Sequence, residues 1–186
     1  MSRLVLIRHA ETGMAGHYCG HSDPDLNDWG RAQLPHLVQQ LSGDSFTAVY
    51  SSDLRRAQST ARAIAEDQSI PQVSRPALRE IHFGEWEGLR WEQIEQLDPQ
   101  YAQKWMAAYP HLPAPGGETY TAFEARVIAE IGQLVKNEPG PIAVVTHAGV
   151  LRIVLQRLCG FSEQDAWQQT RPHCCVMRYE AKGETT

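Results

Sequence analysis

The stretch LVLIRHAETG, residues 4–13, joins an uninterrupted apolar run to charged and titratable side chains. The four residues Leu4 to Ile7 are all apolar, which is typical of a strand buried on both faces inside a parallel sheet. Arg8 and His9 follow this run directly. Ligands of an open parallel sheet bind beyond the carboxyl ends of the strands, so the stretch predicts a sheet and a site at its edge.

Two later stretches repeat this pattern of an apolar run with a polar end. PIAVVTHAG, residues 141–149, contains four apolar residues followed by threonine and His147, and FTAVYSS, residues 46–52, ends in two serines. Parallel strands place their carboxyl ends on one edge of the sheet, and neighbouring strands lie about 5 Å apart. If the first and last of these strands are neighbours, His9 and His147 can face one small ligand.

Amphipathic segments separate the apolar runs, and this alternation predicts an α/β fold. We expect a three-layer α/β/α architecture, with a mainly parallel central sheet and helices on both faces. Residues 81–117 interrupt the alternation with an aromatic-rich stretch, which we interpret as an irregular, cap-like excursion of a single domain spanning 1–186. The expected helices cover 28–41, 53–67, a segment ending near 137, and 150–158, and further strands are expected around 73 and at 174–180.

The composition limits the classes of partner and compartment. The net charge of −5 gives no global field that would attract nucleic acid or an anionic membrane, so an anionic ligand needs local cations. The four cysteines show no spacing typical of a disulfide framework. The first residues lack the pattern of a signal peptide, and no run approaches the about 20 apolar residues of a membrane helix. We therefore expect a cytoplasmic protein that binds neither nucleic acid nor membrane.

Two arginines at the start of the second expected helix strengthen the case for an anion site. Arg55 and Arg56 fall in its first turn, where the helix dipole disfavours a cation by about 0.3 to 1 kcal/mol. A phosphate held by Arg8 and one of these arginines would offset that cost, although Arg55 also fits a solvent-exposed face. The amides of Ala148 and Gly149, at the start of a later helix, could bind the same anion.

A metal site is the alternative to an anion site, because His17, Cys19 and His21 lie close together in the sequence and His9 precedes them. Metal ligands need a fixed geometry and supporting groups around them. The segment is a glycine-rich loop without a spaced set of carboxylates, so we expect no metal and no cofactor.

Four motifs resemble those of the histidine phosphatase superfamily, also called phosphoglycerate mutase-like proteins. They are LIRHAET, SSDLRRAQSTA, LREIHFGEWEG and VVTHAGVLR, which occur in the family's order and span residues 6–152. The segments FGEWEG and PGGETYTAFEARV are most similar to the branch of alpha-ribazole phosphatases and small broad-specificity phosphatases. The chain differs from the family pattern at Ala10, where glycine is usual, at Met14, Ala15 and Cys19 in the following loop, and at His82, where aspartate is common.

The resemblance implies a metal-independent phosphomonoester hydrolase that acts through a phosphohistidine, and alpha-ribazole 5'-phosphate is one substrate it suggests. His9 would be the nucleophile, and Glu80 would protonate the leaving group. Glu11 and Glu118 are weaker candidates for that acid. The phosphate would be bound by the remaining matching groups, namely Arg8, Arg56, His147 and the amide of Ala148.

Other functions remain open at this stage. A phosphoglycerate-type mutase would return the phosphoryl group to its substrate, and a non-catalytic module would only bind a phosphorylated ligand. The expected partner is a small phosphorylated metabolite, and the sequence leaves room for a homodimer. Within the excursion, Trp86 and Trp91 are expected in the core, whereas Trp105 and Tyr109 are expected to form an apolar wall over the site.

Overall fold

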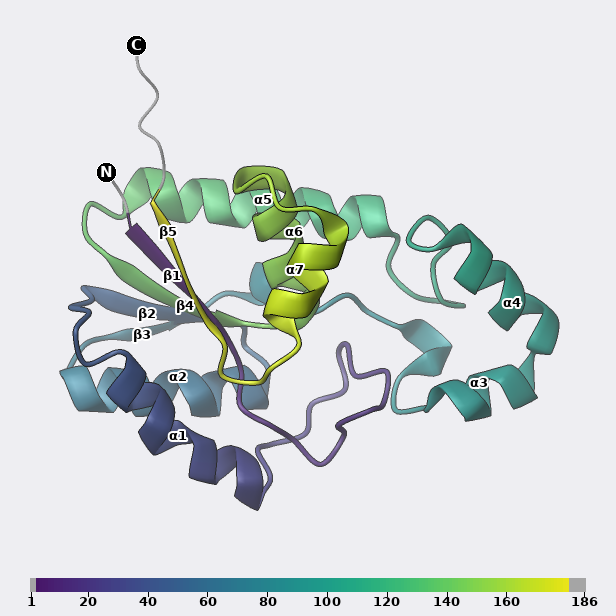
Figure 1. Ribbon diagram of the computed structural model, residues 1–186, viewed down its shortest axis with the longest axis horizontal. Coiled ribbons are helices and arrows are strands. Elements are labelled where there is room, and N and C mark those ends of the chain that lie inside the picture. The colour runs from purple at the N-terminus through teal and green to yellow at the C-terminus, as the bar shows by residue number, and fades with distance from the viewer. Residues whose placement is uncertain (1–2, 181–186) are drawn as a thin grey trace, which may run out of the picture.

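The computed structural model describes residues 3–180 and has a central sheet with helices packed on both of its faces (Figure 1). The strand order is β3-β2-β4-β1-β5, in which β1 to β4 are parallel and β5 is antiparallel at one edge. The fold class predicted from the sequence is confirmed. The strands are β1 (Arg3–Arg8), β2 (Ala48–Ser51), β3 (Gln72–Ser74), β4 (Ile142–Thr146) and β5 (Val176–Glu180).

The pairing of β1 with β4 brings the two histidine motifs together. Arg8 lies opposite Thr146 in the parallel register, and the amide of His9 donates to the carbonyl of Thr146 at 2.9 Å. His9 and His147 are therefore the first residues beyond the ends of two neighbouring strands. The adjacency expected from their sequence pattern is present.

Alternate side chains of the apolar strands face two separate cores, which explains why the runs are uninterrupted. In β1, Leu4 and Leu6 pack on the side of one pair of helices, whereas Val5 and Ile7 pack on the side of the other. All four are fully buried. The first core is covered by α5 (Tyr120–Asn137) and α6 (Ala148–Leu158), and the second by α1 (Asp28–Gln40) and α2 (Arg55–Gln68).

The excursion at residues 81–117 is more regular than the sequence indicated. It contains the short helices α3 (Trp91–Leu97) and α4 (Pro99–Ala108), and Asp98 caps the second by accepting from the amide of Tyr101 at 2.9 Å. Both lie to one side of the sheet in Figure 1. Their buried side chains form a third cluster around Trp86 and Ile94. The expectation of an irregular segment was wrong, because this local cluster stabilises helices too short to show a clear apolar period.

The helix α7 (Glu163–Thr170) was not expected from the sequence. Only Ala166 and Thr170 are buried in it, so it has no apolar stripe that would predict a helix. It packs against α6, and its carboxyl end reaches the edge of the sheet where the strands of the histidine motifs end (Figure 1). Among residues 3–180, no helix is both long and apolar enough to cross a membrane.

Candidate active site

A cavity of about 820 Å³ opens beyond the carboxyl ends of the strands. Arg8, His9, Arg56, Glu80 and Ala148 all line it, so residues from four distant parts of the sequence meet there. The serines at the end of β2 do not line this cavity. Ser51 and Ser52 are fully buried instead, so β2 ends at the expected edge of the sheet without contributing side chains to the cavity.

The ring of His9 is fixed by its own backbone. Its Nδ1 lies 2.7 Å from the carbonyl oxygen of Ala10, and a hydrogen bond there places the proton on Nδ1 and leaves Nε2 with a free lone pair. Burial lowers the pKa of His9 well below its usual value, and the positive charge of Arg56 lowers it further. The imidazole is therefore neutral at pH 7, which is the form required of a nucleophile.

His147 is not among the residues that line the cavity, but its ring centroid lies 5.1 Å from that of His9 in an edge-to-face arrangement. It is 1% exposed, and neither ring nitrogen has a hydrogen-bond partner among the described residues. Buried polar nitrogens are normally paired, so this ring is suited to a polar ligand that enters beside His9. Burial, followed by the charge of Arg56, lowers its pKa well below the usual value as well.

Arg56 lies at the start of α2 and is almost fully buried, with 1% of its surface exposed. Its guanidinium donates to the carbonyls of Ser22 and Gly20, each at 2.7 Å, and to that of Cys19 at 3.3 Å. These contacts hold the loop that follows β1 against the cavity. Arg55 is exposed and pairs with Asp25 at 3.1 Å, so it takes no part in the site.

Arg8 is held by the helix that the sequence did not reveal. Its Nη1 donates to the carbonyl of Thr170 at 3.1 Å and to that of Arg171, at the carboxyl end of α7. Its Nε is buried without a partner among the described residues, and burial lowers its pKa. A donor left free in this way can serve a bound anion.

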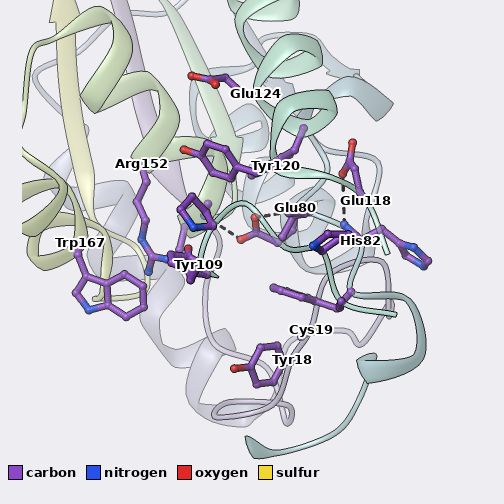
Figure 2. A pocket seen from close by; sticks show the side chains of 18 of the residues that line it. Tyr18, Cys19, Glu80, His82, Tyr109, Glu118, Tyr120, Glu124, Arg152 and Trp167 are labelled. Atoms are coloured by element: carbon purple, nitrogen blue, oxygen red, sulfur yellow. Dashed lines mark hydrogen bonds between the residues drawn. The ribbon is translucent and has the colours of Figure 1, made fainter. Parts of the chain in front are cut away.

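Glu80 is positioned by two backbone amides. Oε2 accepts from the amide of Gly149 at 2.9 Å, and Oε1 accepts from that of Ile81 at 3.0 Å. The amide of Gly149, which the sequence pattern assigned to the anion, is therefore occupied by Glu80. Ala148 keeps its place at the cavity wall. The carboxyl of Glu80 lies among the labelled side chains of the cavity in Figure 2.

Three other acidic residues, of which Glu11 and Glu118 were candidates from the sequence, have structural partners. Glu11 accepts from the side chain of Asn27 at 3.1 Å, and Glu118 pairs with Arg126 at 2.8 Å. Glu87 accepts from the amides of residues 20, 21, 22 and 83 at 2.8–3.1 Å. Burial acts to raise the pKa of Glu87, but these bonds and one from the Ser22 hydroxyl lower it overall. Glu87 thus organises the loop that Arg56 also holds.

The histidines of that loop have other contacts. His17 accepts from Nε of Arg90 at 3.2 Å, and His21 contacts the carbonyl of Glu80 at 3.1 Å. The ring of His21 also lies 4.7 Å from that of His82, the residue that departs from the family pattern. Within residues 3–180, no group of three or more His, Cys, Asp or Glu side chains is arranged to hold a metal ion.

A further histidine of the cavity, close to His9, was not recognised from the sequence. His173 precedes β5, and its ring centroid lies 5.6 Å from that of His9. Burial and the nearby charge of Arg8 lower its pKa to about 4, although Glu11 opposes this shift. Since it follows no apolar run, no local pattern distinguishes it from a loop histidine.

The aromatic residues divide largely as expected. Trp86 is buried in the excursion's own core, and Trp91 is partly buried against it. Trp105 and Tyr109 line the cavity with ring centroids 5.2 Å apart, and Tyr109 is exposed. Trp105 also packs edge-to-face on Trp86, so it belongs both to the wall and to the core behind it.

Comparisons with known proteins agree with this geometry. Residues 4–186 match the histidine phosphatase superfamily (branch 1). The adenosylcobalamin/alpha-ribazole phosphatase of Escherichia coli is 36% identical over 89% of this chain and 83% of its own. A metal-independent phosphoserine phosphatase of Arabidopsis thaliana is 35% identical over 85% and 69%. The alpha-ribazole phosphatase structure from Shigella flexneri superposes with a TM-score of 0.88, at 33% identity over 97% of this chain and 91% of that one. The chain belongs to the histidine phosphatase superfamily, branch 1, and is a phosphatase.

Proposed function

We propose that the chain hydrolyses small phosphate monoesters through a phosphohistidine formed on Nε2 of His9. The observation that supports this most directly is the hydrogen bond between Nδ1 of His9 and the carbonyl of Ala10. It fixes the tautomer in which Nε2 can attack phosphorus, and the depressed pKa keeps that nitrogen unprotonated.

The phosphate needs its charge neutralised before a nucleophile can approach it. Arg8 and Arg56 supply two permanent charges at the cavity wall, and the amide of Ala148 supplies a polar contact there. The unpaired nitrogens of His147, beside His9, supply another. Because these groups come from the chain itself, we propose that the reaction needs no metal ion.

Glu80 acts as the general acid and then as the general base. In the first step the P–O ester bond breaks, the phosphoryl group passes to His9, and Glu80 in its protonated form gives its proton to the leaving oxygen. In the second step a water molecule attacks the phosphohistidine, and ionised Glu80 takes a proton from that water. The products are an alcohol and inorganic phosphate, and both residues return to their starting states.

The substrate is a small phosphorylated metabolite, and alpha-ribazole 5'-phosphate and phosphoserine are the two to test first. Relatives named after each are similar to this chain over most of its length. A cavity of about 820 Å³ with aromatic walls at Trp105 and Tyr109 can hold a leaving group of either size. The four cysteines are free, which fits a reducing compartment such as the cytoplasm.

Rapid quench with a substrate labelled on its phosphoryl group tests this proposal. We expect an acid-labile, alkali-stable phosphoenzyme in the wild type, none in His9→Ala, and turnover that survives EDTA. Label on a serine, or activity that EDTA abolishes and a divalent metal restores, would contradict the proposal. Transfer of the label to a second phosphorylated metabolite rather than to water would identify a mutase, and binding without turnover would identify a non-catalytic module.

A further inference from the structure

Arg152 is a cavity residue for which the proposed reaction has no role. It lies on α6, five residues after His147, and lines the same cavity as His9. Its guanidinium lies 3.7 Å from the ring centroid of Trp167, and its Nε donates to Oγ1 of Thr170 at 3.1 Å. Figure 2 shows Arg152 beside Trp167 and Tyr109, on the opposite side of the view from His82.

The partners of Arg152 orient its guanidinium without neutralising it. Among residues 4–180, the arginines that are not classed as exposed are Arg8, Arg56, Arg79, Arg126 and Arg152. Arg79 pairs with a carboxylate at 2.6 Å and Arg126 with another at 2.8 Å. The other three form no ion pair with any described residue, and all three line the cavity. Arg8 and Arg56 are assigned to the phosphate, so one charge remains.

We propose that Arg152 binds a carboxylate on the leaving group, and so selects phosphate esters of hydroxy acids or hydroxy amino acids. This inference rests on the proposed phosphatase reaction and names its substrate class. The guanidinium is held by the stacking contact with Trp167, the Nε bond to Thr170 and a side-chain hydrogen bond with Tyr109, which leaves further Nη donors for a carboxylate.

One guanidinium suits a single negative charge better than a second phosphate dianion. The next arginine along α6, Arg157, is already paired with Glu124. Glu163 also lines this part of the cavity, and its charge would repel a dianion more strongly than a carboxylate. The Nη donors of Arg152 are the cationic groups left for the ligand here.

Arg152 lines the same cavity as Glu80 and Arg8. Its guanidinium is close enough for the charge of Glu80 to act on it and for its own charge to act on Arg8. The proposed selectivity requires that a carboxylate a few bonds from the ester oxygen binds Arg152 while the phosphate stays beside His9.

Two pairs of substrates isolate the carboxylate. Phosphoserine and phosphoethanolamine differ only by that group, and 3-phosphoglycerate and glycerol 3-phosphate differ by its reduction to an alcohol. We expect the wild type to favour the carboxylate member of at least one pair by about tenfold or more in kcat/KM. Arg152→Met should remove this preference, and Arg152→Lys, which keeps the charge without the planar fork, should retain part of it.

Arg157→Met is the matched control, because it removes an arginine from the same helix whose charge is already paired. It should leave the ratio within each pair unchanged. If the role of Arg152 is purely structural, through Thr170 and Trp167, Arg152→Met should lower the melting temperature and should lower kcat/KM equally for both members of a pair.

Three outcomes would overturn the inference. The first is a wild type that prefers neither carboxylate member, and the second is equal losses within each pair in folded Arg152→Met. The third is a kcat/KM for alpha-ribazole 5'-phosphate that is higher than those for the carboxylate substrates and that Arg152→Met does not reduce. If Arg152→Met does not fold, the wild-type ratios and Arg152→Lys decide the question. A wild type that fails to hydrolyse even p-nitrophenyl phosphate would refute the proposed function, and this inference with it.

Discussion

Gly149→Ala should separate catalysis from stability in this enzyme. Gly149 is the second residue of α6, and its amide holds Oε2 of Glu80 at 2.9 Å. A Cβ at this position would lie 2.1 Å from Oε1 of Glu80 and 3.2 Å from Cε1 of Phe123. Ordinary contact begins at 3.4 Å, so the carboxyl must move by about 3.4 − 2.1 = 1.3 Å. A displacement of about 1 Å can cost a reaction a hundredfold in rate.

The expected loss depends on the leaving group, because Glu80 is proposed to protonate it. For an alkyl ester such as glycerol 3-phosphate, kcat should fall about a hundredfold, as in Glu80→Gln. For p-nitrophenyl phosphate, whose leaving group needs little protonation, the loss should be less than about tenfold. Meanwhile alanine is favoured over glycine within a helix by up to about 1 kcal/mol, which offsets part of the lost hydrogen bond. The melting temperature should therefore change little.

Gly132→Ala provides the control. Gly132 lies on α5, and a Cβ there meets nothing within 4 Å. Gly132→Ala should raise the free energy of unfolding by up to about 1 kcal/mol and leave kcat unchanged for both substrates. Equal losses on both substrates in folded Gly149→Ala, or no loss on either, would refute the role given to Glu80 and the reasoning from this contact.

Three further changes test other parts of the site. Glu87→Gln should lower kcat/KM for every monoester by at least about tenfold, because the loop amides lose a charged acceptor. A fall in kcat/KM for substrates with only one kind of leaving group, measured in steady-state assays, would contradict this role. The free energy of unfolding of the ligand-free enzyme should fall as the pH drops from 6.5 towards 4, because His173 binds a proton in the unfolded chain and resists protonation when buried. Urea titrations of His173→Asn should show a smaller fall, and an identical fall would mean that His173 does not contribute to the pH dependence. Tyr109→Ala should raise KM for the physiological substrate several-fold more than KM for p-nitrophenyl phosphate. The melting temperature should change little, because Tyr109 is exposed at the cavity wall, and unchanged KM values would exclude Tyr109 from substrate binding.

The strands and the paired histidines could be predicted because their signals are local. Leu4 to Ile7 and Ile142 to Val145 are continuous apolar runs, and a polar residue after such a run lies at the ligand-binding edge of a parallel sheet. The two helices of the excursion and α7 carry no equivalent signal. They are short, and they owe their stability to packing against other elements, such as that of Ala102 against Trp86 and its neighbours.

The partners of the site residues could not be predicted for a related reason. Glu87 has the same chemistry as Glu85, and only the folded chain brings the amides of Gly20 to Ser22 to one of them. The same is true of Gly149, whose amide fits an anion by sequence and is occupied by Glu80 in the structure. A sequence pattern identifies a group that can bind an anion, but it does not identify which anion binds.

Arg8 and Arg56 are hydrogen-bonded to carbonyl oxygens rather than to carboxylates, and this explains how the site keeps its positive charge. A carboxylate would fix either guanidinium equally well, but it would cancel the charge that a phosphate dianion needs. Carbonyl dipoles, supplied to Arg8 by the end of α7 and to Arg56 by residues 19–22, orient the guanidinium and leave that charge in place. The charge in turn helps to keep His9 and His147 neutral, because Arg56 is the main ionic influence on both. In the proposed mechanism, the same two arginines therefore attract the substrate and keep His9 unprotonated as its nucleophile.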